Sequence, residues 1–401
     1  MKNSTQNEKI MKKKVIFITQ ALWLGGIETA LVNLLNHLDY EKYDVTCLIT
    51  EDYQDMEDQI TSRCRLIIAD RQHTVTFPKE YKYKRLFNLM EEPQQASSFR
   101  RLIWKIIKLF FRAAEMRLYA QYIKQQIGNE HFDTAVIYSD RVAEIAARSI
   151  SADRFLMFYH NADLGRAYHD IYGYRISEKI IAVSEAQCNK LKKVRSKFAS
   201  KMIAIPNYID VESTRKKAKL ETESPLFPEQ GIHLVSCGRL AYQKGFDIAV
   251  KACAIIVDNG FKNLHWYILG MGPKKKELES MIREYGMENH FHLIGAKKNP
   301  FPYMKAADLY VQPSRTEGYS LSILEARVLA CPTVATFSAA GEQMIDGETA
   351  SLCEANAESI AAAICKHLKN PELSAKYKTE LSKFRFDKVN EDIINKVEEL
   401  L

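Results

Sequence analysis

Short apolar runs recur along this chain and fall into two series separated by a polar stretch. The first series comprises KVIFIT, DVTCLIT, TAVIYS, FLMFYH, KIIAVS and KMIAIPN, and the second, after about residue 230, comprises IHLVSCG, LHWYILG, HFHLIG, DLYVQPS and CPTVATF. Runs that are apolar throughout predict strands covered on both faces, and the helical patterns between them predict parallel sheets. We therefore expect two doubly wound, Rossmann-like α/β domains that face a central cleft.

The domain boundaries follow from the same pattern. At 401 residues the chain is long enough for two or three domains. The first domain is expected over residues 1–208 and the second over 230–375. Residues 209–229 are polar and contain prolines, so they are predicted to be a linker. Residues 376–401 are expected to form a helix that crosses back to the first domain.

Composition narrows the choice of partner and compartment. The net charge of +7 favours anionic partners without choosing among phosphate, acidic lipid and nucleic acid. The eight cysteines form no CxxC pair, so we expect neither disulfides nor a zinc site, and a reducing compartment such as the cytoplasm fits. A short apolar run follows Lys12–Lys14 without a cleavage pattern, and no run is long enough to span a membrane. We therefore expect no signal peptide and no transmembrane helix.

A basic segment at about residues 77–126 interrupts the alternation of strands and helices. Four cations there are spaced to share one helix face beside an apolar stripe: Arg101, Lys105, Lys108 and Arg112. The pattern is typical of a helix at an anionic membrane surface, which would make the protein peripheral on the inner face of the cytoplasmic membrane. A domain helix with a solvated basic face is the open alternative. The aromatic residues follow helix spacing and offer no base-stacking platform, so nucleic acid is not expected as a partner.

Glycine turns follow three of the predicted strands. Gly25 and Gly26 come after the first strand and open a helix, where backbone can approach a phosphate or sugar closely; a plain tight turn is the alternative. In the second series, GRLAYQKG places Arg239 and Lys244 in one strand-end loop, which suits a diphosphate. Gly270 lies in a further glycine turn at the same sheet edge.

The stretch SRTEGYSLSILEA places Glu317 and Glu325 eight positions apart. A strand is expected over 308–313, a loop over 314–319 and a helix over 320–330. Glu317 then lies at the mouth of the cleft and Glu325 within the helix. Because carboxylates accept hydrogen bonds from vicinal hydroxyls, we expect the two to bind different parts of one sugar-containing ligand.

Together these motifs resemble the retaining glycosyltransferases of family 4, which have the two-domain GT-B architecture. The family's pair of glutamates separated by seven residues is present in EGYSLSILEA. Its G-R-L…K-G loop is present as GRLAYQKG, its glycine turn as GGIE, and its asparagine-bearing strand end as IPNYID. Gly341 and Glu342 fit a glycine–glutamate element in which Ala340 replaces the usual second glycine. The resemblance covers most of the chain and is strongest from about Val235 to Ala350.

The resemblance implies a role for each motif residue. Arg239 and Lys244 would hold the diphosphate of a nucleotide diphosphate sugar, and Glu325 would bind its ribose. Glu317 would contact the transferred sugar, which His160 would face from the first domain. The implied catalytic residues are thus Glu317, His160, Arg239 and Lys244. Further donor contacts would come from Gly25, Gly26, Gly270, Gly318, Tyr319, Ser320 and Leu321, and from the backbone of Ile294 and Gly295 at the base.

The implied reaction is hexosyl transfer with retention to a hydroxyl of a glycan or lipid-linked acceptor. Such transfers build exopolysaccharide, capsule or cell-envelope polysaccharide, with a UDP-sugar as the most frequent donor. No cofactor is expected beyond this co-substrate. The sequence contains no Asp-x-Asp pair, so no metal is expected. Two other functions stay open, namely a nucleotide-sugar epimerase or hydrolase on the same fold and a non-catalytic nucleotide-sugar-binding protein.

Overall fold

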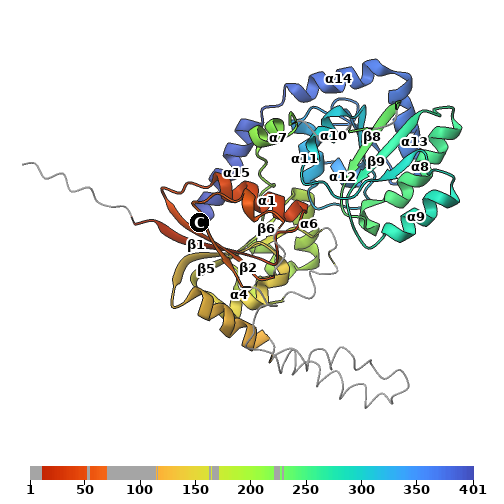
Figure 1. Ribbon diagram of the computed structural model, residues 1–401. Coiled ribbons are helices and arrows are strands. Elements are labelled where there is room, and N and C mark those ends of the chain that lie inside the picture. Colours follow the sequence, from red (N-terminus) through yellow and green to blue (C-terminus); the bar gives the residue numbers. More distant parts are fainter. Residues whose placement is uncertain are drawn as a thin grey trace, which may run out of the picture.

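The structure is a computed structural model that describes residues 11–51, 55–69, 114, 116–161, 164, 171–220, 226–227 and 230–401. The described residues form two lobes, each built on one parallel sheet with helices on its faces (Figure 1). The four cations of the basic segment, Arg101, Lys105, Lys108 and Arg112, lie outside the described residues. None of the described helices combines the length and the apolar character needed to cross a bilayer.

The first lobe contains a seven-stranded sheet. In spatial order its strands are β3 (Arg65–Ile68), β2 (Tyr43–Ile49), β1 (Lys13–Thr19), β4 (His131–Ile137), β5 (Ser151–Tyr159), β6 (Lys179–Ala182) and β7 (Met202–Ala204). Its helices are α1 (Gly26–His37), α4 (Ala143–Ser149), α5 (Ile171–Ile176) and α6 (Glu185–Val194), with residues 116–127 also helical. Short 3-10 turns lie at Glu57–Gln59, Asp140–Val142 and Ser196–Lys201.

The second lobe contains a six-stranded sheet. In spatial order its strands are β10 (Phe291–Leu293), β9 (Leu264–Leu269), β8 (Ile232–Cys237), β11 (Leu309–Gln312), β12 (Thr333–Thr336) and β13 (Ser351–Cys353). Its helices are α8 (Phe246–Asp258), α9 (Lys275–Glu284), α10 (Phe301–Ala306), α11 (Leu321–Val328), α12 (Phe337–Ala340), α13 (Ala357–Lys369) and α14 (Pro371–Ser382), with a 3-10 turn at Tyr242–Lys244.

The burial of the strands on both faces explains why apolar runs in the sequence predicted the fold. In β1, Val15 and Phe17 pack into one core cluster, whereas Ile16 and Ile18 pack into another on the opposite face of the sheet. Both faces of the strand are therefore covered, as a run without polar alternation requires. Every strand pairing in the described part of the chain is parallel, and the predicted pair of doubly wound domains is confirmed.

Two strands were absent from the expected set. β3 has four residues and β13 has three, and each lies at the edge of its sheet. The other two edge strands, β7 and β10, are equally short, but each lies in a longer apolar run, KMIAIPN or HFHLIG, and was predicted. β3 in particular contains no fully buried residue.

The connections between lobes also differ in detail from the expectation. Residues 209–229 include a helix, α7 (Val211–Lys217), whose first turn is capped by the Asp210 side chain. Residues 376–401 contain the end of α14 and a separate helix, α15 (Phe386–Leu400). Ile393 and Val397 of α15 pack into the core of the first lobe, where the chain end lies beside β1 (Figure 1).

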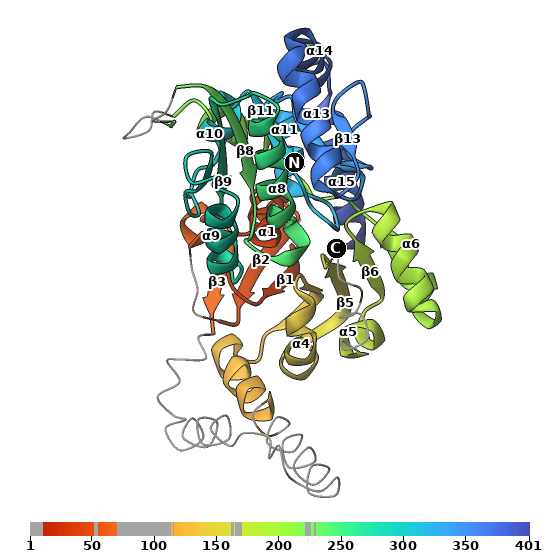
Figure 2. The same cartoon turned by 90° about the vertical axis from the view of Figure 1, so that its right-hand side faces the viewer.

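Strand order locates the cleft. In each sheet the order reverses between two neighbouring strands, β1 and β4 in the first lobe and β8 and β11 in the second. The loops that follow such strands diverge to opposite faces and leave a crevice at the carboxyl edge of the sheet. Helices α1 and α11, which follow β1 and β11, meet where the two lobes come together (Figures 1 and 2).

Candidate active site

A lysine–glutamate pair bridges the two central strands of the second sheet. Lys244 lies in the loop after β8 and Glu317 in the loop after β11, and Lys244 Nζ is 2.6 Å from Glu317 Oε1. The side chains are 22% and 13% exposed, so the pair is largely shielded from water. The sequence placed both residues in the site, and the structure brings them into direct contact at the reversal of strand order.

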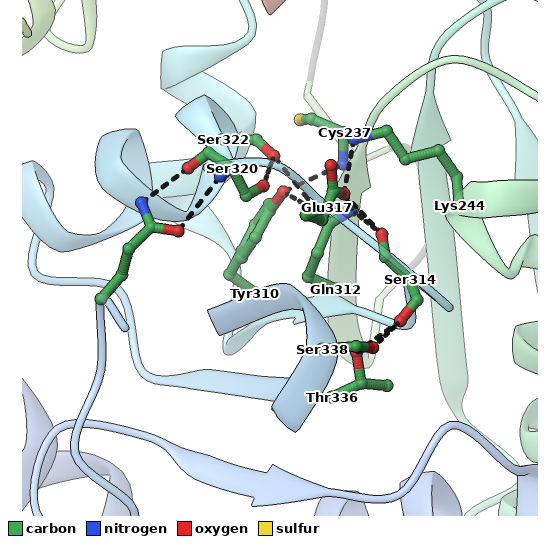
Figure 3. Close-up of polar contacts among 11 residues, drawn as sticks. Cys237, Lys244, Tyr310, Gln312, Ser314, Glu317, Ser320, Ser322, Thr336 and Ser338 are labelled. Carbon is green, nitrogen blue, oxygen red and sulfur yellow. Dashed lines mark hydrogen bonds and ion pairs between the residues drawn. The ribbon is translucent and has the colours of Figure 1, made fainter. Parts of the chain in front are cut away.

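Glu317 is held by a buried polar network (Figure 3). Its Oε1 accepts hydrogen bonds from Ser314 Oγ at 2.7 Å and from Gln312 Nε2 at 3.4 Å. Gln312 also donates to Ser314 Oγ and accepts from the Tyr310 hydroxyl. Because Gln312 and Ser314 are fully buried, their bonds fix the carboxylate in one orientation.

The network extends to the next strand. Thr336 and Ser338, in β12 and α12, donate hydroxyl hydrogen bonds of 2.5 and 2.8 Å to the carbonyl of Ser314. Neither Gln312 nor Ser314 was among the predicted site residues. The available signal was a glutamine at the end of an otherwise apolar strand, since a polar side chain at such a position needs a partner.

The Lys244 loop is fixed by a second ion pair. Arg315 binds Asp247 through two hydrogen bonds of 2.7 and 2.6 Å, and its guanidinium lies over the Tyr242 ring. Although burial alone would raise it, the hydrogen bonds and charge of Arg315 lower the pKa of Asp247 below its usual value. Between these residues, Gly245 has φ +68° and a Cβ there would lie 2.0 Å from the Pro313 carbonyl oxygen. The β8 and β11 loops therefore pack too closely for any residue but glycine.

Arg239, the second predicted diphosphate ligand, is exposed in the same loop. Its charge acts on Glu28, at the start of α1 in the first lobe. Burial raises the pKa of Glu28 to about 7, and the charges of Arg239 and Arg141 act in the opposite direction. Glu28 was not among the predicted site residues, although it belongs to the GGIE turn.

Glu325 lies inside α11 with only 8% of its surface exposed. Burial raises the pKa of its carboxyl group to about 8, while the charges of Lys217 and Lys244 lower it. Unlike Glu317 it has no direct ion pair with Lys244, so the two glutamates occupy different environments within one site. The expectation that they serve different parts of a ligand remains a prediction.

Glycine backbone forms the adjoining part of the second-lobe edge. The N–H of Gly270 donates to the carbonyl of Gly295 at 3.0 Å, and a Cβ at Gly270 would lie 1.9 Å from the Gly238 carbonyl oxygen. Gly295 itself has φ +77°. Ile294 donates its N–H to Ile268 in the sheet, so the predicted base contact through Ile294 is left to its other backbone atoms.

The start of α11 presents backbone N–H groups to the same edge. The N–H of Ser320 donates to Gln343 Oε1 at 3.1 Å, and Gln343 Nε2 donates back to the Ser320 carbonyl. Leu321 begins the helix, where the first N–H groups have no intrahelical partner. Tyr319 is partly buried and packs against a small apolar cluster that includes Leu321. The N–H of Leu321 is therefore available to a sugar donor, whereas the N–H of Ser320 is already bound to Gln343.

His160 lies at the end of β5 in the first lobe, as predicted. Its ring packs against Tyr138, at 4.7 Å between centroids, and stacks on Phe158. Burial lowers the pKa of His160 to about 3, so the imidazole is neutral, and Nε2 has no partner among the described residues. The atom that meets the second lobe is the backbone carbonyl, 2.9 Å from where a Cβ at Gly318 would lie. The predicted contact of the ring with a sugar stays a prediction.

Gly25 and Gly26 lie in the first lobe, at the start of α1. Gly25 caps α1 in an extended conformation, and a Cβ there would meet the Glu28 carboxylate at 2.5 Å. A Cβ at Gly26 would lie 3.8 Å from Leu321 Cβ, which places the glycine turn against the start of α11. These proximities place Gly26 and His160 of the first lobe beside the start of α11 and the loop that bears Glu317. Among the described residues no three metal-ligating side chains gather together.

Comparison with known proteins agrees with this geometry. Residues 218–383 match the family model described as "Glycosyl transferases group 1". The chain is 25% identical over 240 residues to the putative colanic acid biosynthesis glycosyltransferase WcaL of Escherichia coli, covering 56% of each chain. It is 30% identical over 189 residues to the N-acetylgalactosamine-N,N'-diacetylbacillosaminyl-diphospho-undecaprenol 4-alpha-N-acetylgalactosaminyltransferase of Campylobacter jejuni, covering 46% of this chain and 49% of that one. The chain spans about half the length of the curated relatives it matches.

Solved structures extend the likeness to both lobes. Anabaena Alr3699/HepE, crystallised with UDP and glucose, superposes with a TM-score of 0.70 at 16% identity, covering 96% of this chain and 99% of that one. S. aureus TarM superposes with a TM-score of 0.68 at 13% identity over the same shares. The two-lobed chain therefore has the GT-B fold, and its residues 218–383 are similar to the glycosyltransferase group 1 family.

Proposed function

We propose that the protein is a retaining hexosyltransferase that uses a nucleotide diphosphate sugar, most often a UDP-sugar, to extend a bacterial surface polysaccharide. The observation that carries the proposal is the Lys244–Glu317 pair at the reversal of strand order, with Arg239 exposed in the same loop. Cations at this edge suit a diphosphate, and a fixed carboxylate beside them suits the hydroxyls of the attached sugar.

The relatives support the donor and the pathway class. A structural neighbour was crystallised with UDP-glucose, and curated relatives are named for colanic acid, amylovoran and O-antigen biosynthesis. The Campylobacter relative is named for a diphospho-undecaprenol substrate. By analogy we propose a glycan or lipid-linked acceptor at the cytoplasmic face of the membrane for this chain.

The proposed chemistry assigns the positive side chains to the leaving group. When the bond between the sugar C1 and the diphosphate oxygen breaks, its electron pair stays on that oxygen, and negative charge grows there. Arg239 and Lys244 stabilise this charge more in the transition state than in the ground state, which is what accelerates the step. Lys244 has three N–H donors, so it can bind Glu317 and a phosphate oxygen together.

Retention of configuration in a single displacement requires the acceptor to attack from the side that the diphosphate leaves. We propose that the acceptor hydroxyl oxygen bonds to C1 as its proton passes to the departing phosphate oxygen. Glu317 holds the sugar hydroxyls during this step. The two glutamates do not suit a double displacement, because Glu317 is already paired with Lys244. That mechanism needs two carboxylates about 5 Å apart that flank the bond being broken.

Metal independence is part of the proposal. Arg239 and Lys244 supply the charge that a divalent ion supplies in other nucleotide-sugar enzymes. Transfer should therefore proceed at an undiminished rate after dialysis against a chelator. Loss of activity in chelator that a single divalent ion restores would contradict this part of the proposal.

An acceptor-dependence assay separates the candidate functions. Nucleotide sugars are first screened by thermal shift, and the best ligand is then incubated with and without glycan and lipid-linked acceptors. Nucleotide release that requires an acceptor, with a new glycosidic product in the original anomeric configuration, supports the proposal. A free sugar or an epimer formed without acceptor would indicate the hydrolase or epimerase alternative. Tight binding with no turnover on any acceptor would indicate a binding protein.

A further inference from the structure

Helix α6 of the first lobe begins where that lobe meets the second. The first N–H groups of a helix have no partner within it and need an acceptor from elsewhere. Ser184 Oγ, in the same lobe, accepts the N–H of Gln187 at 3.1 Å. The N–H groups of Glu185 and Ala186 donate instead to the two carboxylate oxygens of Glu342, at 3.1 and 2.5 Å. A carboxylate of the second lobe thus caps a helix of the first.

The origin of this carboxylate matters. A carboxylate near a helix N-terminus is stabilised by charge-assisted hydrogen bonds and by the helix dipole. An acidic residue of the first lobe would satisfy the helix equally well at any separation of the lobes. Because Glu342 belongs to the second lobe, its hydrogen bonds to α6 form only when the two lobes are at the separation seen in this structure. Glu342 is solvent-exposed, so the bond can break and re-form in water.

Residues next to this contact on both lobes reach the loop that bears Glu317. Gln187, in the first turn of α6, donates from Nε2 to the carbonyl of Asn161 at 2.8 Å. A Cβ at Gly318 would lie 2.8 Å from Gln187 Nε2 and 2.9 Å from the His160 carbonyl. On the other side, Gln343 follows Glu342 directly and binds the backbone of Ser320. The loop at 341–343 therefore touches both the first-lobe helix and the loop that bears Glu317.

We propose that Glu342 is a positioning residue for transfer: its bond to α6 sets the His160–Asn161 strand end against Gly318, and so fixes the spacing between the two halves of the cleft. The proposal rests on the proposed function for what the two halves bind. The spacing of the lobes can be tested without that function.

The kinetic test uses Glu342→Ala, Glu342→Gln and the control Glu348→Ala. The proposed donor ligands Arg239, Lys244 and Glu325 all belong to the second lobe, so affinity for UDP should change by less than about threefold in calorimetry. The turnover number should fall by about fivefold or more, the equivalent of a helix-end charge and its hydrogen bonds. Glu342→Gln retains one acceptor oxygen without the charge and should be intermediate. Glu348 is exposed in the same region and accepts no side-chain hydrogen bond from the described residues, so its variant should match the wild type.

The structural test measures the distance between the two lobes by double electron–electron resonance between two spin labels. Cysteines introduced at Lys190 on α6 and Glu358 on α13, both exposed, carry the spin labels. The native cysteines are all buried, so they should react slowly with the label. The parent protein should give one narrow distance distribution, and Glu342→Ala should broaden it toward longer distances, while its melting temperature stays near that of Glu348→Ala.

The outcomes distinguish a failure of the role of Glu342 from a failure of the proposed sugar transfer. Identical distance distributions for the parent and Glu342→Ala would overturn the role of Glu342, whatever the activity. Turnover within twofold of the wild type would do the same. If the wild type transfers no sugar, the proposed function fails, while the distance and UDP-affinity measurements still decide whether Glu342 couples the lobes.

Discussion

Replacing Lys244 tests the assignment of the second-lobe site most sharply. The Lys244→Ala change removes an ion pair at 2.6 Å between side chains that are 22% and 13% exposed. A hydrogen bond to a charged group contributes roughly 1.5–3 kcal/mol, and its loss leaves Glu317 largely buried beside only neutral donors. We therefore expect the free energy of unfolding to fall by about 2 kcal/mol. The removal of one preorganised charge from the leaving group should lower transfer by roughly 100- to 1,000-fold.

A matched variant separates charge from packing. A Cβ at Gly238 would lie 3.3 Å from Lys244 Cε, which shows how closely the lysine stem covers this glycine. Lys244→Met keeps most of that stem and removes only the ammonium group. It should lose transfer as severely as Lys244→Ala but lose less stability. Adding Glu317→Gln to Lys244→Met should recover part of the stability, because the unpaired carboxylate is then removed.

The assays are acceptor-dependent nucleotide release, calorimetric UDP binding and urea unfolding followed by circular dichroism. Both lysine variants should bind UDP more weakly and transfer sugar more slowly than the wild type. Near-normal transfer by Lys244→Ala would refute the assignment of Lys244 to the diphosphate. Loss of stability alone, with unchanged kinetics of the folded fraction, would show that the ion pair is purely structural.

Three further predictions concern backbone, protonation and surface charge. Gly245→Ala should destabilise the protein more than Gly286→Ala, because both positions have a left-handed φ but only Gly245 faces a clash; equal melting temperatures would contradict this. Burial raises the pKa of Glu325 from 4.5 to about 8, so the folded state binds its proton more tightly and loses stability as pH rises through this window. Glu325→Gln should therefore gain stability relative to the wild type up to pH about 8 in urea unfolding, whereas a pH-independent difference would argue against it. The protein should sediment with anionic liposomes, and this should be lost when four basic residues outside the described region are replaced by serine: Arg101, Lys105, Lys108 and Arg112. Sedimentation that does not depend on lipid charge would contradict the membrane role of these residues.

The central strands and the loops that follow them were predictable because their chemistry is local. A run such as KVIFIT is typical of a strand covered on both faces in a parallel sheet, and Lys244 and Glu317 each follow such a run. Their contact follows once β8 and β11 are neighbours. The edge strands β3 and β13 were missed: β3 contains no fully buried residue, and β13 consists of only three residues, SLC.

The supporting residues were not predictable in the same way. Gln312 and Ser314 contact Glu317 within one strand-end segment, and the glutamine at the end of an apolar strand was the only sign of them in the sequence. Glu342 acts through a helix of the other lobe, and such a pairing depends on the tertiary arrangement, which no local pattern encodes. His160 shows the reverse case: its position at a strand end was predictable, whereas the packing that encloses its ring was not.

Calorimetric titration of the wild-type protein with a panel of nucleoside diphosphates and nucleotide sugars tests the central claim most directly. One ligand of this class should bind at a single site, with an affinity that weakens as salt rises and drops sharply when Arg239 is replaced by alanine. The account is contradicted if no member of the panel binds, or if the bound ligand is indifferent to both salt and Arg239.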